Sequence, residues 1–119
     1  MKLALSTLLT ALVLSACAGI HARNDVLMPA MVIALEGIKP DIVSGADAAA
    51  LSELADLEAA LKSGNIQAAL NANWHLLYGI AVKSLDDRLA AQEIGITVHR
   101  ILRQRLEAFN ESYLKLRQL

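Results

Sequence analysis

Apolar residues recur every three or four positions over the last quarter of the chain, a spacing that a helix places on one side. This apolar stripe consists of Val98, Leu102, Leu106, Phe109, Tyr113 and Leu116. Between its members lies a polar face made of Arg103, Glu107, Glu111 and Lys115. The pattern predicts an amphipathic helix with one buried face, running from about Asp86 almost to Leu119.

Gly95 interrupts this pattern. It stands among β-branched residues in the stretch EIGITV, and both kinds of residue have low helix propensity. The sequence therefore leaves two outcomes open, which are a kink near Gly95 or a break that divides the segment into two helices.

Another helix is predicted between Ser44 and Gly64. Ser44 and Asp47 stand three positions apart in front of an apolar run, which is the spacing of a capping box. Gly64 is the residue type that most often follows the end of a helix. The buried side of this helix is predicted to be formed by Leu51, Leu54, Leu57 and Leu61.

A further helix is predicted over residues 66–83, with Asn65 as its N-cap. Apolar side chains occupy nearly its whole circumference, which is typical of a helix in the middle of a bundle. Ser84 and Asp87 then repeat the capping-box spacing and predict the start of the last helix.

The first helix is predicted to be short, over residues 25–36. Pro29 falls near its first turn, where a missing N–H is tolerated, and Gly37 is placed to end it. Pro40 and Gly45 then mark a linker. Since no pair of strands with a hairpin turn is recognisable, the predicted fold class is all-α. We expect a small antiparallel helical bundle over residues 25–119, with three long helices and a short first one.

The charges exclude a partner held by bulk electrostatics. Lys and Arg total 11 against 12 Asp and Glu, so we expect no binding to nucleic acid. The distribution is uneven, because residues 25–58 hold seven acidic groups and one Lys, whereas residues 100–119 hold five basic and two acidic groups. Two interpretations stay open: attraction between two faces of the bundle, or contact of the basic helix with anionic lipid.

The first seventeen residues have the three parts of an export signal. Met1 and Lys2 supply a positive start, an uncharged apolar stretch follows over residues 3–16, and Cys17 comes directly after small residues. Fourteen residues make about 21 Å of helix, which is shorter than the bilayer core of about 30 Å. We therefore predict a cleaved signal peptide over residues 1–16 rather than a transmembrane helix.

The last four residues of this segment, Leu14-Ser15-Ala16-Cys17, resemble the lipobox of bacterial lipoproteins. The resemblance covers only the leader. It implies cleavage before Cys17, attachment of a diacylglycerol to the Cys17 sulfur, and usually acylation of the new amino terminus. In this class Ala18 is typical of sorting to the outer membrane.

Residues 17–24 are then predicted to be a lipidated tether. Its seven residues after Cys17 reach at most about 25 Å, so the folded part would lie close to the lipid headgroups on the periplasmic side. Two or more acyl chains hold a protein stably at a membrane.

The sequence contains none of the short motifs that mark common active sites. Gly-rich phosphate loops, G-x-S-x-G, H-E-x-x-H and paired cysteines are not found in it. The prediction is a non-enzymatic, membrane-anchored lipoprotein without a cofactor, which acts through an envelope protein partner.

Asn71, His75 and Tyr78 are the candidate residues for a polar pocket. Asn71 stands four positions before His75, and Tyr78 stands three after it, so one helix would place all three on one face. They form either a ligand pocket or a cluster of interhelical hydrogen bonds at the edge of the core.

Haem binding is the alternative within the same class of ligand-binding bundles. Small periplasmic four-helix cytochromes of the b type use a Met and a His from opposite ends of the chain, and Met28 or Met31 with His99 is similar to that arrangement. The first helix is too short for that fold, and Met at helical spacing is more often a core residue.

Overall fold

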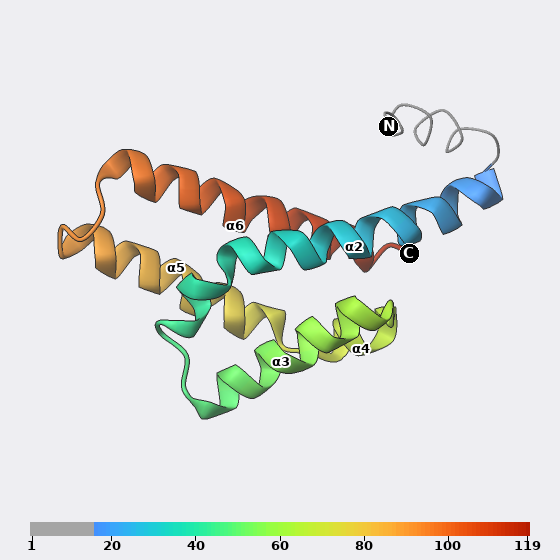
Figure 1. Cartoon of the computed structure of the whole chain (residues 1–119), viewed down its shortest axis with the longest axis horizontal. Coiled ribbons are helices and arrows are strands. Elements are labelled where there is room, and N and C mark those ends of the chain that lie inside the picture. The colour runs from blue at the N-terminus through green and yellow to red at the C-terminus, as the bar shows by residue number, and fades with distance from the viewer. Residues whose placement is uncertain (1–15) are drawn as a thin grey trace.

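Helices account for almost all of the described chain (Figure 1). The computed structural model describes residues 16–119, and side chains from residue 26 onward. Within residues 16–119 it contains no strand and five helices, namely α2 (Ala16–Val43), α3 (Ala48–Ser63), α4 (Ile66–Asn71), α5 (Trp74–Ala90) and α6 (Ile96–Leu116). The all-α prediction is confirmed. The predicted signal peptide and the Cys17 side chain lie outside the described residues.

The first helix is longer than the sequence predicts. α2 passes through both Gly37 and Pro40 and ends at Val43, and its backbone includes the predicted tether. Beyond Gly37 the helix still buries Ile38 and Ile42 completely, in register with Met28, Met31 and Leu35. Burying two such side chains contributes about 3–6 kcal/mol, which is enough to offset the cost of about 4 kcal/mol in helix propensity for one Gly and one Pro.

α3 begins and ends at locally encoded caps. The Asp47 carboxylate accepts from Ala50 N at 2.9 Å and forms the N-cap, whereas Ser44 lies outside the helix and donates to Asp41 O. Gly64 has a φ of 71°, and its N–H closes the helix against Ala60 O and Leu61 O. The leucine stripe is buried except for Leu51, which is 41% exposed, so the prediction for Leu51 is wrong.

The helix predicted over residues 66–83 is divided in two. Asn65 caps α4 as predicted, but α4 ends at Asn71, and Asn73 caps a new helix by accepting from Leu76 N at 3.1 Å. α5 then continues through Ser84 to Ala90, so the predicted helix start at Ser84 is wrong. α5 is also not buried on all sides, because His75 and its neighbour Leu76 are exposed.

The structure has a break near Gly95, which is one of the two outcomes that the sequence left open. Residues 91–95 form the turn between α5 and α6, and α6 begins at Ile96 with Gly95 as its N-cap. Four members of the predicted apolar stripe of α6 are buried, which are Leu106, Phe109, Tyr113 and Leu116. Val98 is 45% exposed, because the first turns of α6 project beyond the centre of the bundle (Figure 1).

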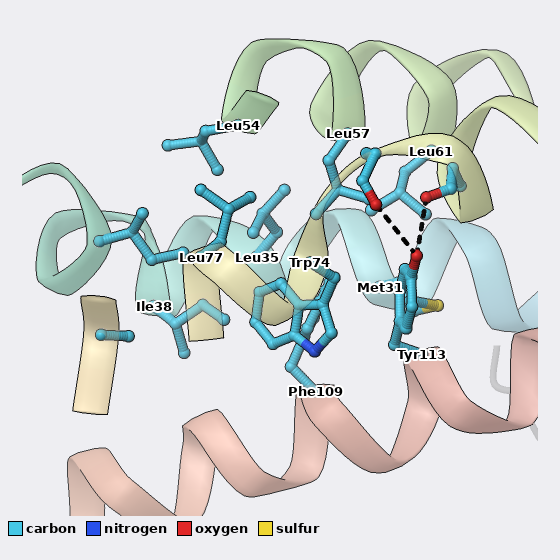
Figure 2. Close-up of a cluster of buried hydrophobic side chains, with 14 of the residues drawn as sticks. Met31, Leu35, Ile38, Leu54, Leu57, Leu61, Trp74, Leu77, Phe109 and Tyr113 are labelled. Carbon is cyan, nitrogen blue, oxygen red and sulfur yellow. Dashed lines mark hydrogen bonds between the residues drawn. The ribbon is translucent and has the colours of Figure 1, made fainter. Parts of the chain in front are cut away.

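α2 packs against α3, α5 and α6 and runs antiparallel to α6, and α5 likewise packs against three helices (Figure 1). The core between them is shown in Figure 2. Trp74 from α5 and Phe109 from α6 are in contact with ring centroids 4.7 Å apart and ring planes tilted by 57°. This aromatic pair joins the α5–α6 hairpin to the leucines of α2 and α3.

Candidate functional site

A hollow of about 620 Å³ opens where α4 gives way to α5, beside the end of α6. Asn71, His75 and Tyr78, the three candidate residues from the sequence, all line it. The sequence predicts that one helix carries all three residues, and this prediction is wrong. Asn71 is the last residue of α4, whereas His75 and Tyr78 belong to α5.

Four further polar side chains, which the sequence did not predict, also line the hollow. These are Gln67, Asn73, Asn110 and Arg117. Gln67 and Asn73 lie close to Asn71 in the chain, so the polar run around it was a usable signal. Asn110 lies on α6 and Arg117 directly follows the end of α6, nearly forty residues or more downstream, and only the packing of α6 beside α5 brings them here.

The turn between α4 and α5 is held in place by α6. The buried Tyr113 hydroxyl lies 3.0 Å from Ala69 O, 3.3 Å from Leu70 O and 3.4 Å from Ala72 O, and donates to this group of carbonyls (Figure 2). Burial raises the pKa of Tyr113, and Arg117 acts in the opposite direction. The floor of the hollow is therefore a fixed part of the core.

Hydrogen bonds within the protein orient the amides around the hollow. Trp74 Nε1 donates to Asn110 Oδ1 at 2.9 Å, and Leu76 N donates to Asn73 Oδ1 at 3.1 Å. Asn71 Oδ1 accepts from Gln67 Nε2 at 3.2 Å. Each of the three asparagines thus uses its carbonyl oxygen internally.

Tyr78 is turned toward α6. Its hydroxyl donates to Glu107, which also accepts from Arg103 Nε at 3.0 Å. The hydrogen bond from Tyr78, together with that from Arg103, lowers the pKa of Glu107. The same hydrogen bond and burial raise the pKa of Tyr78. Through these hydrogen bonds Tyr78 forms an interhelical cluster with Glu107 and Arg103 at the rim of the hollow.

His99 lies apart from the two methionines of the haem alternative. Its Nε2 is 2.9 Å from Asp86 Oδ1, near the turn between α5 and α6. Met28 and Met31 are buried in the core on the N-terminal half of α2, which lies away from the first turns of α6 (Figure 1). The structure does not bring these residues together as a pair of haem ligands.

An ion pair with a buried carboxylate links α2 to α5. Asp41 is only 5% exposed and accepts from Arg88 Nη1 at 2.9 Å. Burial raises the pKa of Asp41, while Arg88 and, from α6, Arg105 act to lower it. Arg88 lies outside the basic segment 100–119, of which only Arg105 acts on Asp41, so this pair does not decide between the two interpretations of the charge distribution.

Among the described residues no three His, Cys, Asp or Glu side chains gather where they would hold a metal ion. Within residues 16–119 no helix combines the length and apolarity that crossing a bilayer requires. No family model, curated protein or solved structure matches the chain.

Proposed function

We propose that this protein is a non-enzymatic lipoprotein, anchored through Cys17 at the periplasmic face of the outer membrane, where it acts through another envelope protein. The observation that carries the proposal is the sequence Leu14-Ser15-Ala16-Cys17 at the end of an uncharged apolar run. Its non-enzymatic part rests on the motifs that the sequence lacks.

Exposed apolar side chains at the start of α6 support the part of the proposal that concerns a partner. Val98 and Ile101 are 45% and 44% exposed and stand three positions apart, so they are neighbours on the helix surface. Adjacent exposed apolar groups are common in protein contact surfaces, whose centres are poor in charged residues. We therefore assign the partner contact to this part of α6.

The anchor is tested by mass spectrometry of the protein purified from membranes in detergent. We expect a mature chain that begins at Cys17 and carries the added mass of the diacylglycerol and the amino-terminal acyl chain. Cys17→Ser is the matched control, because it changes one atom of the side chain and removes the acylated sulfur. We expect this variant to leave the membrane fraction or to keep its leader. An unmodified thiol in the wild-type protein would rule the proposal out.

The partner contact is tested by photocrosslinking in intact cells. A photoreactive residue at Ile101 should give one discrete adduct with an envelope protein. The same residue at Ala55, which is exposed on α3, is the control and should give none. If both positions gave the same products, or if Ile101 gave only lipid, the partner part of the proposal would have to be withdrawn.

A further inference from the structure

The hollow between α4, α5 and the end of α6 has an unusual balance of hydrogen-bonding groups. Asn110 and Asn73 both line it, and the carbonyl oxygen of each is already used. The donors to these oxygens are an indole N–H and a backbone N–H, which cannot accept a hydrogen bond, so the orientation of both amides is determined. The side-chain group of each asparagine that remains available to a ligand is its NH₂ group, which can only donate hydrogen bonds.

The residues that line the hollow include one permanently charged side chain. Arg117 carries a permanent positive charge, and the lining contains no Asp or Glu. Two carboxylates lie just outside. Glu107 accepts from Tyr78 and Arg103, and Glu53 accepts from Asn73 N at 2.9 Å. Both have hydrogen-bond donors of the protein as partners.

The helix dipoles do not decide the sign of the site. α5 begins at the hollow with its partial positive charge, whereas α6 and the short α4 end there with partial negative charges, so the contributions oppose each other. The last carbonyls of α4 already accept from the Tyr113 hydroxyl. The side chains therefore set the preference. The free groups of Asn73, Asn110 and Arg117 are all donors, which suits an anion, whereas Gln67 at the edge of the lining keeps its amide oxygen as an acceptor.

We propose that this hollow binds a small organic anion through its carboxylate group. One permanent positive charge matches a monoanion better than a phosphate monoester, which carries nearly two negative charges at neutral pH. A guanidinium also binds a planar carboxylate through two parallel hydrogen bonds. Leu70 and Leu114 line the same hollow and give an apolar surface for the rest of the ligand. The carboxylate can belong to a free acid or to the end of a short peptide.

The test is NMR titration of the full chain in detergent with four probes: butyrate, trialanine, trialanine amide and inorganic phosphate. We expect butyrate or trialanine to shift the side-chain NH₂ signals of Asn110 and Asn73 at millimolar concentration. Binding of butyrate alone identifies a free acid as the ligand type, and tighter binding of trialanine identifies a peptide end. Trialanine amide should not bind, because it lacks the carboxylate.

Two variants test the assigned groups. Arg117→Gln should weaken binding about tenfold or more, since it removes a charge-assisted hydrogen bond. Asn110→Asp keeps the acceptor for Trp74 but replaces the donor by a carboxylate oxygen, and should abolish binding. Lys115→Gln makes the same charge change as Arg117→Gln at a position outside the hollow, and should leave the affinity nearly unchanged.

Several results would overturn the inference. These are no shifts with either carboxylate at tens of millimolar, equal binding of trialanine amide, tighter binding of phosphate, and equal loss of affinity in Lys115→Gln and Arg117→Gln. Arg117 is exposed, so its variant should remain folded, and its melting temperature checks this. The inference does not depend on the membrane anchor, which is tested separately.

Discussion

The indole N–H of Trp74 donates to Oδ1 of Asn110 at 2.9 Å and joins the beginning of α5 to the second half of α6. Trp74 is 4% exposed, so water does not replace Asn110 as its partner. This bond contributes to the stability of the fold and also fixes the direction of the Asn110 amide.

We predict that Asn110→Ala lowers the free energy of unfolding by about 1–3 kcal/mol, because it leaves a buried N–H without an acceptor. Urea denaturation measures the effect. In a Trp74→Phe background, which has no indole N–H, the same change should have a smaller effect. Equal losses in the two backgrounds would assign the loss to something other than this hydrogen bond.

Pro40 lies inside α2, exposed, where it removes a backbone hydrogen bond. We predict that Pro40→Ala stabilises the protein by about 1–2 kcal/mol, because the gain in helix propensity exceeds the added entropy of the unfolded chain. Thermal and urea unfolding measure the change. A destabilised Pro40→Ala variant would indicate that residues 38–43 are the linker suggested by the sequence.

Leu35 and Ile33 stand two positions apart on α2 but in opposite environments. Leu35 is completely buried, whereas Ile33 is 75% exposed. We predict a loss of about 2–5 kcal/mol for Leu35→Ala, through lost burial and the cavity left behind. Ile33→Ala should change stability by less than about 0.5 kcal/mol. Similar losses of stability in Leu35→Ala and Ile33→Ala would contradict the structure, in which α2 turns Leu35 into the core and Ile33 outward.

Removing Arg88 would leave the Asp41 carboxylate buried beside Arg105 alone. We predict that Arg88→Met lowers the free energy of unfolding by about 2–3 kcal/mol at pH 7. This loss is somewhat smaller than the loss expected for a fully buried ion pair, because Arg88 is partly exposed. Asp41→Asn should lower the free energy of unfolding by less than Arg88→Met, since the Arg88 side chain that loses its partner reaches water.

The Asp41 pair also predicts a pH dependence. Burial raises the pKa of Asp41, so the stability linked to its protonated form is present at low pH and is lost as the pH rises through the raised folded pKa. Without Arg88 this pKa rises further. The gap in melting temperature between Arg88→Met and the wild type should therefore narrow from pH 7 toward pH 4, and a gap that widened would contradict this account.

Tyr78 and Glu107 predict two limbs in the pH profile of stability. The lowered pKa of Glu107 adds stability above its ordinary value of about 4.3, and this stability is lost as the pH falls through the folded pKa. The raised pKa of Tyr78 adds stability below about pH 10, and this is lost as the pH rises through the folded pKa.

Melting temperatures across the pH range measure both limbs. Glu107→Gln should flatten the acid limb and reduce the alkaline one, whereas Tyr78→Phe should reduce the alkaline limb to the part that Tyr113 contributes. Because Glu107 is 41% exposed, each effect should stay within about 1 kcal/mol. Unchanged profiles in both variants would contradict the interhelical bond.

The sequence by itself determined the fold class and the ends of several helices. Asp47, Gly64 and Asn65 act as caps through contacts with residues no more than four positions away, and such contacts can be recognised in the order of residues. The stripe from Leu106 to Leu116 is likewise a local pattern, set by the helical period. The prediction of a membrane anchor at Cys17 also comes from the sequence alone.

The tertiary structure decided the length of α2 and the composition of the hollow. α2 continues past Gly37 because other helices bury Ile38 and Ile42, an energy that no local propensity contains. The hollow exists because Tyr113 holds the α4–α5 turn and α6 places Asn110 and Arg117 beside it. These contacts join residues about forty positions apart, and their free energy depends on packing between helices, which the spacing of residues along one helix does not specify.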